Sequence, residues 1–262
     1  MNEKKFRRIV VKIGTNALME NGKISKGVIT ELARQLSIVR QSGSEVILVT
    51  SGAIGFGIEK MGIGFPKKNP ARQAMAAIGQ GALMNYYSEA FARHDQNIGQ
   101  VLLTNQNFTD KESFKTTGNT MEKLLEFGVI PIINENDAVS AEALSAKKPF
   151  ADNDGLAALI AMSFGADLLV LLTDVDGIFT DNPKDNNTAQ KIKGLKELLS
   201  RNVIIGRKSD YGIGGMNSKI LAVKSALGKG ISVAVCKARE NAVVDVVNNM
   251  CSGSFFEGGT DG

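Results

Sequence analysis

Six short apolar runs recur along the chain, and each has the length of a β-strand. They lie at residues 9–13, 45–50, 98–103, 129–134, 168–173 and 231–236. None of them alternates strictly between apolar and polar residues, which is typical of strands that are buried on both faces. Longer segments with apolar residues at helical spacing lie between the runs, at residues 25–41, 71–93, 111–127, 154–164 and 216–227. This alternation predicts an α/β fold in which helices cover both faces of a mainly parallel sheet.

The segments between these elements indicate one domain. No repeat of fixed period and no long Pro- or Gly/Ser-rich linker divides the chain, and we place the domain at residues 1–253. Residues 138–152 are rich in Ala, Ser and Lys with one Pro, and residues 174–193 are polar and carry turn signals, so we expect loops in both places. The Gly-rich, polar end of the chain, residues 254–262, is expected to be a flexible tail.

The composition excludes several classes of protein. Of the 262 residues, 43% are hydrophobic and 22% are charged, which is typical of a globular chain rather than a disordered one. The 31 Lys and Arg against 27 Asp and Glu leave a net charge of +4, which is too small to indicate nucleic-acid binding without a clustered basic patch. The basic stretch at residues 184–208 contains no Tyr or Trp on which bases could stack. We therefore expect no nucleic-acid partner, and the charge suits an anionic small molecule.

The small numbers of histidine and cysteine exclude several kinds of metal site and a disulfide-stabilised fold. The chain has one histidine, His94, and two cysteines, Cys236 and Cys251. These numbers exclude a His-rich metal centre, a Cys-based zinc site and a disulfide framework, and we expect two reduced thiols. No apolar run approaches the ~18 residues that span a membrane, and the apolar stretch behind the basic N-terminus is too short for a signal peptide. We expect a cytoplasmic protein that does not enter a membrane.

Glycine-rich loops follow the first two predicted strands, and ligands of open α/β sheets bind at such strand ends. Gly14 follows the first strand, and Ser51, Gly52 and Ala53 follow the second. Glycine lets the backbone approach a ligand and free N–H groups bind anions, so the two loops could hold an anion; equally, they could be tight turns and nothing more. The chain contains neither a P-loop nor a GxGxxG motif.

Polar side chains also follow the fourth predicted strand and precede the helix at 154–164. Asn134 and Asp137 form the first group, and Asp152, Asn153 and Asp154 form the second. Asp152 or Asn153 could cap the helix by accepting hydrogen bonds from its first N–H groups. Capping would leave two of the three residues without a structural role, which makes this group a candidate for ligand binding.

A third group of residues suits phosphate. Thr173 and Asp174 follow the fifth strand, and a glycine-rich loop leads into the helix at 216–227, with Lys219 in its first turn. Loop N–H groups and a lysine together bind phosphate well, although an isolated lysine is more often simply solvated. With Lys12 near the other end of the chain, the pattern favours phosphoryl transfer, which needs positive charge and positioning but no His or Cys. A bridging Mg²⁺ needs only one or two carboxylates beside the phosphates.

Six blocks of sequence resemble the amino acid kinase family, in family order. They are VVKIGTNAL, LVTSGAIGFG, IPIINENDAV, ADNDGLAA, LLTDVDGIFTDNP and GIGGMNSK, between residue 9 and about residue 253. INENDAV and the GGMNSK loop resemble the glutamate kinase branch in particular. The resemblance implies a three-layer α/β/α sandwich with a mainly parallel central sheet. It implies that ATP and L-glutamate react to ADP and glutamyl 5-phosphate, the first step of proline synthesis, with Mg²⁺ as cofactor. It also implies a homo-oligomer, with L-proline as a feedback inhibitor to be tested.

The resemblance implies roles for individual positions. Lys12 and Lys219 match the lysines that stabilise the transferring phosphoryl group, and Asp154 matches the aspartate that holds them. The expected substrate-binding residues are Ser51, Gly52, Ala53, Asn134, Asp137, Asp152 and Asn153. The expected ATP-binding residues are Lys12, Gly14, Thr173, Asp174, Ile213, Gly214, Gly215, Met216, Asn217, Ser218 and Lys219. No protein ligand of a metal is implied, since the nucleotide phosphates are expected to hold most of the Mg²⁺ coordination.

The chain departs from the family pattern at three positions. Ile213 stands where a threonine is expected, Ser218 replaces the commoner threonine, and Phe150 stands where a glycine is expected, which could reshape the substrate loop. The C-terminal PUA domain that many glutamate kinases carry is expected to be absent. Two alternatives stay open: a kinase of acetylglutamate or aspartate, and a non-catalytic sensor of glutamate or proline. The acids near the site favour a substrate with a free ammonium, and the presence of both lysines argues against the sensor.

Overall fold

Seven strands form one sheet in the order β5-β6-β4-β1-β7-β8-β9. The computed structural model describes residues 6–20, 23–140, 150, 152–181, 186, 188–192, 194, 197–198 and 216–259. The strands are β1 (Arg8–Ile13), β4 (Glu45–Val49), β5 (Ile98–Leu103), β6 (Ile130–Glu135), β7 (Leu168–Thr173), β8 (Ser232–Lys237) and β9 (Ser254–Phe256). The six predicted strands are confirmed, with each end within one residue of its expected position. Two short strands, β2 (Met19–Glu20) and β3 (Lys23–Ile24), form a separate hairpin.

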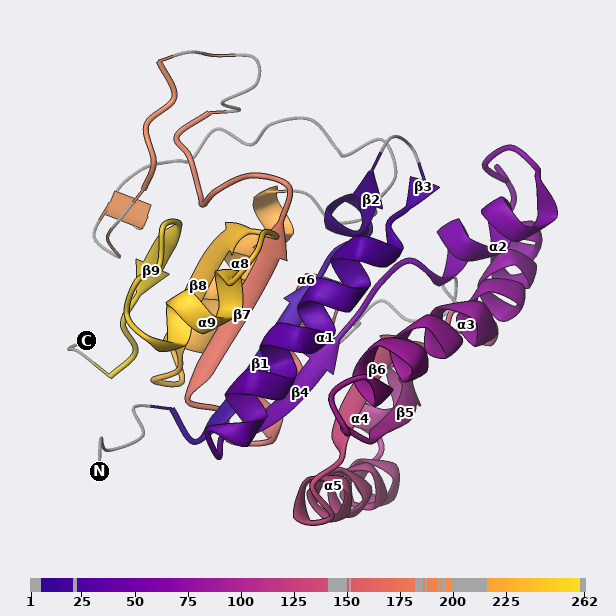
Figure 1. Ribbon diagram of the computed structural model, residues 1–262, viewed down its shortest axis with the longest axis horizontal. Helices are drawn as coiled ribbons and strands as arrows, with labels where there is room; N and C mark the ends of the chain where they lie inside the picture. The colour runs from indigo at the N-terminus through magenta and orange to yellow at the C-terminus, as the bar shows by residue number, and fades with distance from the viewer. Residues whose placement is uncertain are drawn as a thin grey trace.

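The sheet is parallel except at one edge. β1 pairs in parallel with β4 on one side and with β7 on the other, and only β9 runs antiparallel, beside β8. The chain passes from β1 to β4, then to β5 and β6 on the same side of β1, and later crosses to β7 and β8 on the other side (Figure 1). The carboxyl ends of β1, β4, β6 and β7 are therefore neighbours at the point where the strand order reverses, which is where open α/β sheets bind ligands.

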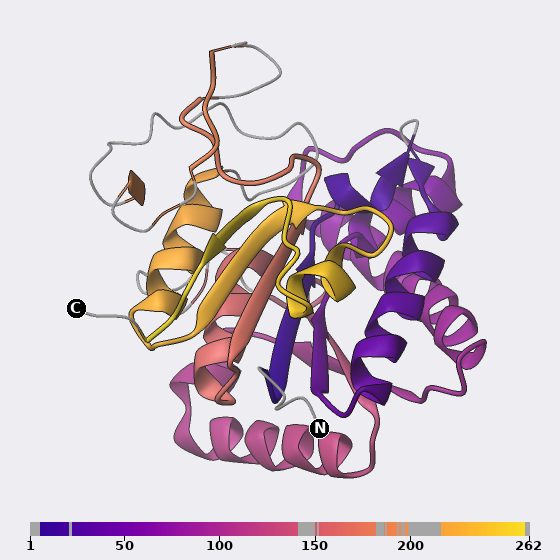
Figure 2. The ribbon, with the colours of Figure 1, turned by 60° about the vertical axis from the view of Figure 1, so that its left-hand side comes forward.

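Helices cover both faces of the sheet, which confirms the predicted α/β/α arrangement. Side chains of α1, α2, α3 and α9 share one buried cluster with the sheet, and side chains of α5, α6 and α8 share another. Figure 2 shows α1 and α3 on one side of the sheet and α8 on the other. The helices are α1 (Lys26–Gln41), α2 (Ala53–Met61), α3 (Asn69–Ala92), α4 (Gln106–Thr109), α5 (Lys111–Glu126), α6 (Asn153–Ser163), α8 (Met216–Leu227) and α9 (Ala242–Val247).

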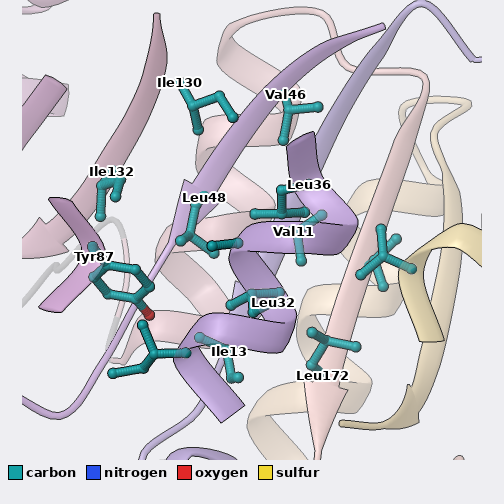
Figure 3. Close-up of a cluster of buried hydrophobic side chains, with 14 of the residues drawn as sticks. Val11, Ile13, Leu32, Leu36, Val46, Leu48, Tyr87, Ile130, Ile132 and Leu172 are labelled. Atoms are coloured by element: carbon teal, nitrogen blue, oxygen red, sulfur yellow. The ribbon is translucent and has the colours of Figure 1, made fainter. Parts of the chain in front are cut away.

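The alternation of side chains along β1 decides which layer Lys12 faces. Val11 and Ile13 pack with α1 in the first cluster, as Figure 3 shows beside Leu32 and Leu36. Val10 belongs to the second cluster, with α5, α6 and α8. Because successive side chains of a strand point to opposite faces, Lys12 points to the same layer as Val10. The strand thus delivers its lysine to the α6 and α8 side of the sheet.

The segment after β4 begins a helix that the apolar pattern did not reveal. Gly52 adopts a left-handed conformation (φ 105°) and precedes α2. Helices α2 and α3 then approach each other closely: a Cβ at Gly79 would lie 1.9 Å from the carbonyl oxygen of Ala53, and one at Gly57 would lie 2.0 Å from that of Met75. Only glycine allows this packing, and because glycine has a low helix propensity, the same residues made α2 hard to predict from the sequence.

The prediction of a flexible tail from residue 254 is wrong for residues 254–259. Ser254–Phe256 form β9, in which Ser254 and Phe256 are 0% and 1% exposed. The Ser254 hydroxyl donates to the Ile192 carbonyl over 2.6 Å and accepts from the Ile178 N–H over 3.0 Å. A buried aromatic ring and these hydrogen bonds outweigh the polar, Gly-rich composition on which the prediction was based. None of the helices in the described ranges combines the length and apolar character that a membrane crossing requires.

Candidate active site

An aspartate holds two lysines at the carboxyl edge of the sheet. The Lys12 Nζ lies 2.5 Å from Asp154 Oδ1, and the Lys219 Nζ lies 3.0 Å from Asp154 Oδ2. The Ser218 hydroxyl donates to the same Oδ2 over 3.1 Å. The side chains of Asp154, Lys12 and Lys219 are 1%, 6% and 12% exposed. The structure thus brings together the three residues predicted to be catalytic, from positions as distant as 12 and 219.

The electrostatics of this cluster keep the carboxylate ionised. Burial by itself raises the pKa of the Asp154 carboxyl, but the charges of Lys12 and Lys219 outweigh burial and lower it to about 2. Burial lowers the pKa of the Lys12 ammonium, and the attraction of Asp154 offsets only part of that effect, while Lys219 adds repulsion. Two ammoniums share one carboxylate, so the cluster as a whole attracts further anionic charge such as phosphate.

The start of α6 explains why Asp154 sits where it does. Asp152 is the N-cap, and its Oδ1 accepts from the N–H groups of Asp154 and Gly155 over 3.0 and 2.9 Å. Asp154 follows in the first turn, where the helix dipole favours a negative charge. Lys219 occupies the first turn of α8, and α8 packs beside α6 in the same buried cluster. The capping alternative is therefore correct for Asp152. Asn153 and Asp154 do not cap the helix, and their side chains make other contacts.

Asn153 links the ends of β4 and β6 through its amide. Its Nδ2 donates to the Thr50 carbonyl over 3.0 Å, to the Ser51 hydroxyl over 2.8 Å and to Asn134 Oδ1 over 3.2 Å. Asn134 Nδ2 in turn donates to Gln80 Oε1 over 2.9 Å. Asn134 is 1% exposed and Ser51 is 9% exposed, so this network is buried at the carboxyl edge of the sheet. Three of the predicted substrate residues are thereby in direct contact.

The remaining predicted substrate positions lie around this network. Gly52 and Ala53 form the entry to α2, next to Ser51, so the first N–H groups of that helix face the same edge. Asp137 lies in the turn that follows Glu135, the last residue of β6, and is partly buried. Gly14 follows β1, and a Cβ there would approach Lys12 Nζ to 3.2 Å. Glycine thus leaves room beside the lysine.

The predicted nucleotide positions are only partly described. Thr173 is the buried last residue of β7, and its hydroxyl donates to Asp174 Oδ1 over 3.2 Å. Met216, Asn217 and Ser218 form the first turn of α8 with Lys219. Ile213, Gly214 and Gly215 lie outside the described residues, and so does the effect of the Ile213 departure.

Phe150 has a structural role in the described part of the chain. It is 4% exposed and packs edge-on against Phe108, with ring centroids 5.7 Å apart. A Cβ at Gly155 would lie 3.3 Å from its Cβ, so Phe150 also lies close to the start of α6. The residue that departs from the family pattern is therefore itself a buried core residue close to the start of α6.

Sequence reasoning missed two contributors to the site, Gln80 and Tyr87. Gln80 holds the Asn134 amide, and the Tyr87 hydroxyl lies 2.7 Å from Thr50 Oγ1. Both residues belong to α3, for which the sequence pattern predicted a helix and no role in the site. The one available signal was Gln80 itself, a polar residue between two glycines in an otherwise apolar stretch of that helix.

The chain is similar in sequence and in fold to known proteins. The profile of the amino acid kinase family matches residues 7–237. The chain is 38% identical over 256 residues to the glutamate 5-kinase of Ligilactobacillus salivarius, covering 95% of this chain and 96% of that protein. It is 39% identical over 263 residues to the glutamate 5-kinase of Methanosarcina barkeri, covering 96% and 68%. The carbamate kinase from Giardia lamblia bound to AMP-PNP shares the fold, with a TM-score of 0.67 at 16% identity over 96% of this chain and 98% of that one.

Proposed function

Because the chain belongs to the amino acid kinase family, we propose that it transfers the γ-phosphoryl group of ATP to the γ-carboxylate of L-glutamate, as the first step of proline synthesis. The products are ADP and glutamyl 5-phosphate. The observation that carries the proposal is the pair of buried lysines on Asp154, at the strand edge that also carries the Asn153 network. The similarity to glutamate 5-kinases over nearly the whole chain supports glutamate as the acceptor.

The reaction needs no proton transfer from the protein. The side-chain carboxylic acid of glutamate has a pKa of about 4.3, so its γ-carboxylate is already a nucleophile at neutral pH. Its oxygen forms the new bond to the γ-phosphorus while the bond from that phosphorus to the ADP oxygen breaks, and the electron pair leaves with ADP. Two anions must approach each other, and the ammoniums of Lys12 and Lys219 offset their repulsion. Asp154 keeps both ammoniums in place during the approach.

The other half of the site suits an amino acid. Glutamate carries an ammonium and two carboxylates, and Asp137 and Asp152 lie on the edge where they can attract the ammonium. The N–H groups at the start of α2, from Gly52 and Ala53, suit a carboxylate. N-acetylglutamate has no ammonium and should bind worse. Aspartate is one methylene shorter, so its side-chain carboxylate falls short of the lysines when its ammonium is bound.

We propose Mg-ATP as the second substrate. Among the described residues, no group of three or more His, Cys, Asp or Glu side chains is placed to hold a metal ion. These residues do not form a cage of their own, and we propose that Mg²⁺ arrives on the nucleotide phosphates. Thr173, Asp174 and the first turn of α8 are the described residues proposed to contact ATP. Feedback inhibition by L-proline and self-association are further proposals, which glutamate kinetics with added L-proline and the mass in solution would test.

The deciding experiment is an ADP-release assay with Mg-ATP and separate additions of L-glutamate, N-acetylglutamate, L-aspartate and UMP. Hydroxylamine traps an acyl phosphate as a hydroxamate, which identifies the phosphorylated carboxylate. We expect ADP release and hydroxamate with L-glutamate alone. Turnover with another acceptor would move the substrate assignment within the family, and folded protein without turnover on any acceptor would favour the sensor.

Lysine variants test the mechanism within the same assay. Lys12→Ala and Lys219→Ala should each lower kcat by about a hundred-fold or more, the range seen when one charge-stabilising donor is removed. Lys224→Ala is the matched control, because Lys224 is an exposed lysine of the same helix as Lys219. Near-normal kcat in either folded site variant would contradict the proposed role.

A further inference from the structure

Gln80 of α3 ends a chain of side-chain amides that reaches the substrate side of the site. Its Oε1 accepts from Asn134 Nδ2 over 2.9 Å, and Asn134 Oδ1 accepts from Asn153 Nδ2 over 3.2 Å. The three residues come from α3, from β6 and from the first turn of α6. The chain of amides therefore runs from one helical layer, past the edge of the sheet, to the other layer.

Two backbone groups decide which way every amide in this chain faces. The Thr50 carbonyl can only accept, so the Asn153 atom 3.0 Å from it is the nitrogen. The Glu135 N–H can only donate, and it lies 2.9 Å from Asn134 Oδ1. Asn134 must then direct its nitrogen towards Gln80, and Gln80 must present its oxygen. The two backbone groups therefore determine which atom of each of the three amides is the donor and which is the acceptor.

This polarity leaves one acceptor on the residue predicted to bind substrate. Among the described residues, Asn153 Oδ1 has no hydrogen-bond partner, although it is fully buried. Gln80 Nε2, at the opposite end of the chain, is likewise buried without a partner in the described part of the structure. A buried polar atom without a partner is unfavourable, and a ligand donor would relieve that cost for Asn153. Removing the Gln80 acceptor would leave Asn134 Nδ2 without its partner as well, in a residue that is 1% exposed.

We propose that Gln80 is a positioning residue for glutamate binding, which acts by holding the Asn134 amide and, through it, the Asn153 amide. The inference rests on the proposed glutamate kinase activity. Gln80 lies in the layer opposite to Asp154 and the two lysines, and among the described residues its hydrogen bonds lead towards them through Asn134 and Asn153. Its removal should therefore weaken L-glutamate binding and leave ATP binding unchanged.

Three variants of Gln80 separate its acceptor from its bulk. Gln80→Met removes the acceptor at similar size, and Gln80→Asn keeps an amide that is too short to reach Asn134. Gln80→Glu keeps an oxygen in place for Asn134 Nδ2. Asn85→Leu is the matched control, because it removes an amide from the exposed side of the same helix, where the Asn85 amide donates to Glu89. For each variant, KM for L-glutamate, KM for ATP, kcat and Tm are measured.

The first two variants should raise KM for L-glutamate about ten-fold or more, with KM for ATP and kcat within about two-fold of wild type, since a ten-fold change in binding matches about one hydrogen bond. Gln80→Glu should recover most of the loss, and Asn85→Leu should resemble wild type. If Gln80→Met does not fold, the comparison of Gln80→Asn with Gln80→Glu decides. An unchanged KM for L-glutamate, or an equal rise in both KM values, would overturn the inference. Wild-type protein without turnover on L-glutamate would instead overturn the proposed function, and this inference with it.

Discussion

Replacing Asp154 by asparagine tests the centre of the site most directly. Both carboxylate oxygens carry a lysine ammonium, and the side chain is 1% exposed. Asparagine has the same shape but no charge, and its NH₂ group would face one of the two ammoniums. Asp154→Asn therefore leaves two positive charges in a buried site without the carboxylate that holds them.

The expected loss of stability follows from the pKa of Asp154. The pKa falls from an ordinary value of 3.8 to about 2 on folding, and each unit is worth about 1.4 kcal/mol, so the ionised carboxylate contributes about 2 kcal/mol at pH 7. Breaking a buried ion pair by removing one partner costs about 3–5 kcal/mol in other proteins. A domain with about 5–15 kcal/mol of stability survives a loss at the lower end of this range and remains folded for assay.

The expected loss of activity comes from displacement of the two lysines that Asp154 holds. Displacing catalytic groups by about 1 Å costs about a hundred-fold in rate, so Asp154→Asn should lower kcat at least that much in the folded protein. Glu122→Gln is the matched control: Glu122 contacts Arg8 at the opposite end of β1, over 2.7 and 2.9 Å. It should lower Tm and leave kcat unchanged. A folded Asp154→Asn protein with kcat near that of wild type would refute the reasoning.

Three further predictions rest on single observations. Folding lowers the pKa of Asp154, so the ionised carboxylate stabilises the fold fully above about pH 4, and this contribution is lost as the pH falls towards 2. Urea unfolding between pH 5 and 2 should therefore show that the free energy of unfolding falls by about 2 kcal/mol more in wild type than in Asp154→Asn. A hydrogen bond with the Cys236 thiol lowers the pKa of Cys251 to about 7, whereas the pKa of Cys236 is raised. Iodoacetamide at pH 8 should therefore label Cys251 before Cys236, as followed by mass spectrometry. Labelling in the reverse order would contradict this prediction. Gly79→Ala should lower Tm because its Cβ would meet the Ala53 carbonyl, whereas Gly81→Ala, with open space around it, should not; equal Tm values would contradict the packing of α2 on α3.

The strands could be predicted from the sequence because burial on both faces gives them uninterrupted apolar runs. Helix α2 and strand β9 could not, since glycines interrupt the helix and flank the strand. Gly55 and Gly57 lower the helix propensity of α2, yet Gly57 is what allows α3 to approach. Gly253 and Gly258 flank β9, and each lies so close to neighbouring backbone that a Cβ would clash. In both cases tertiary packing outweighs local propensity.

The site shows a different limit of sequence reasoning. The residues at 152, 153 and 154 were predicted as a group, but their separate tasks depend on three-dimensional contacts. Asp152 caps α6, Asn153 joins the ends of the strands, and Asp154 holds the lysines. Spacing alone cannot separate these roles, because three consecutive residues at a helix start all point in different directions. Only the partners, which are distant in sequence, distinguish them.

The division of the site between the two helical layers explains why Gln80 escaped prediction. Lys12, Asp154 and Lys219 all face the layer of α6 and α8, and each follows a recognisable pattern of strand end or helix start. Gln80 comes from the middle of α3 in the opposite layer, where a polar residue has no such pattern. It is connected to the site because Asn134, near the end of β6, hydrogen-bonds to Gln80 of one layer and to Asn153 of the other. Substitution of Gln80 in α3 should therefore affect binding of the acceptor substrate, while substitution of Asp154 in α6 or Lys219 in α8 should affect phosphoryl transfer.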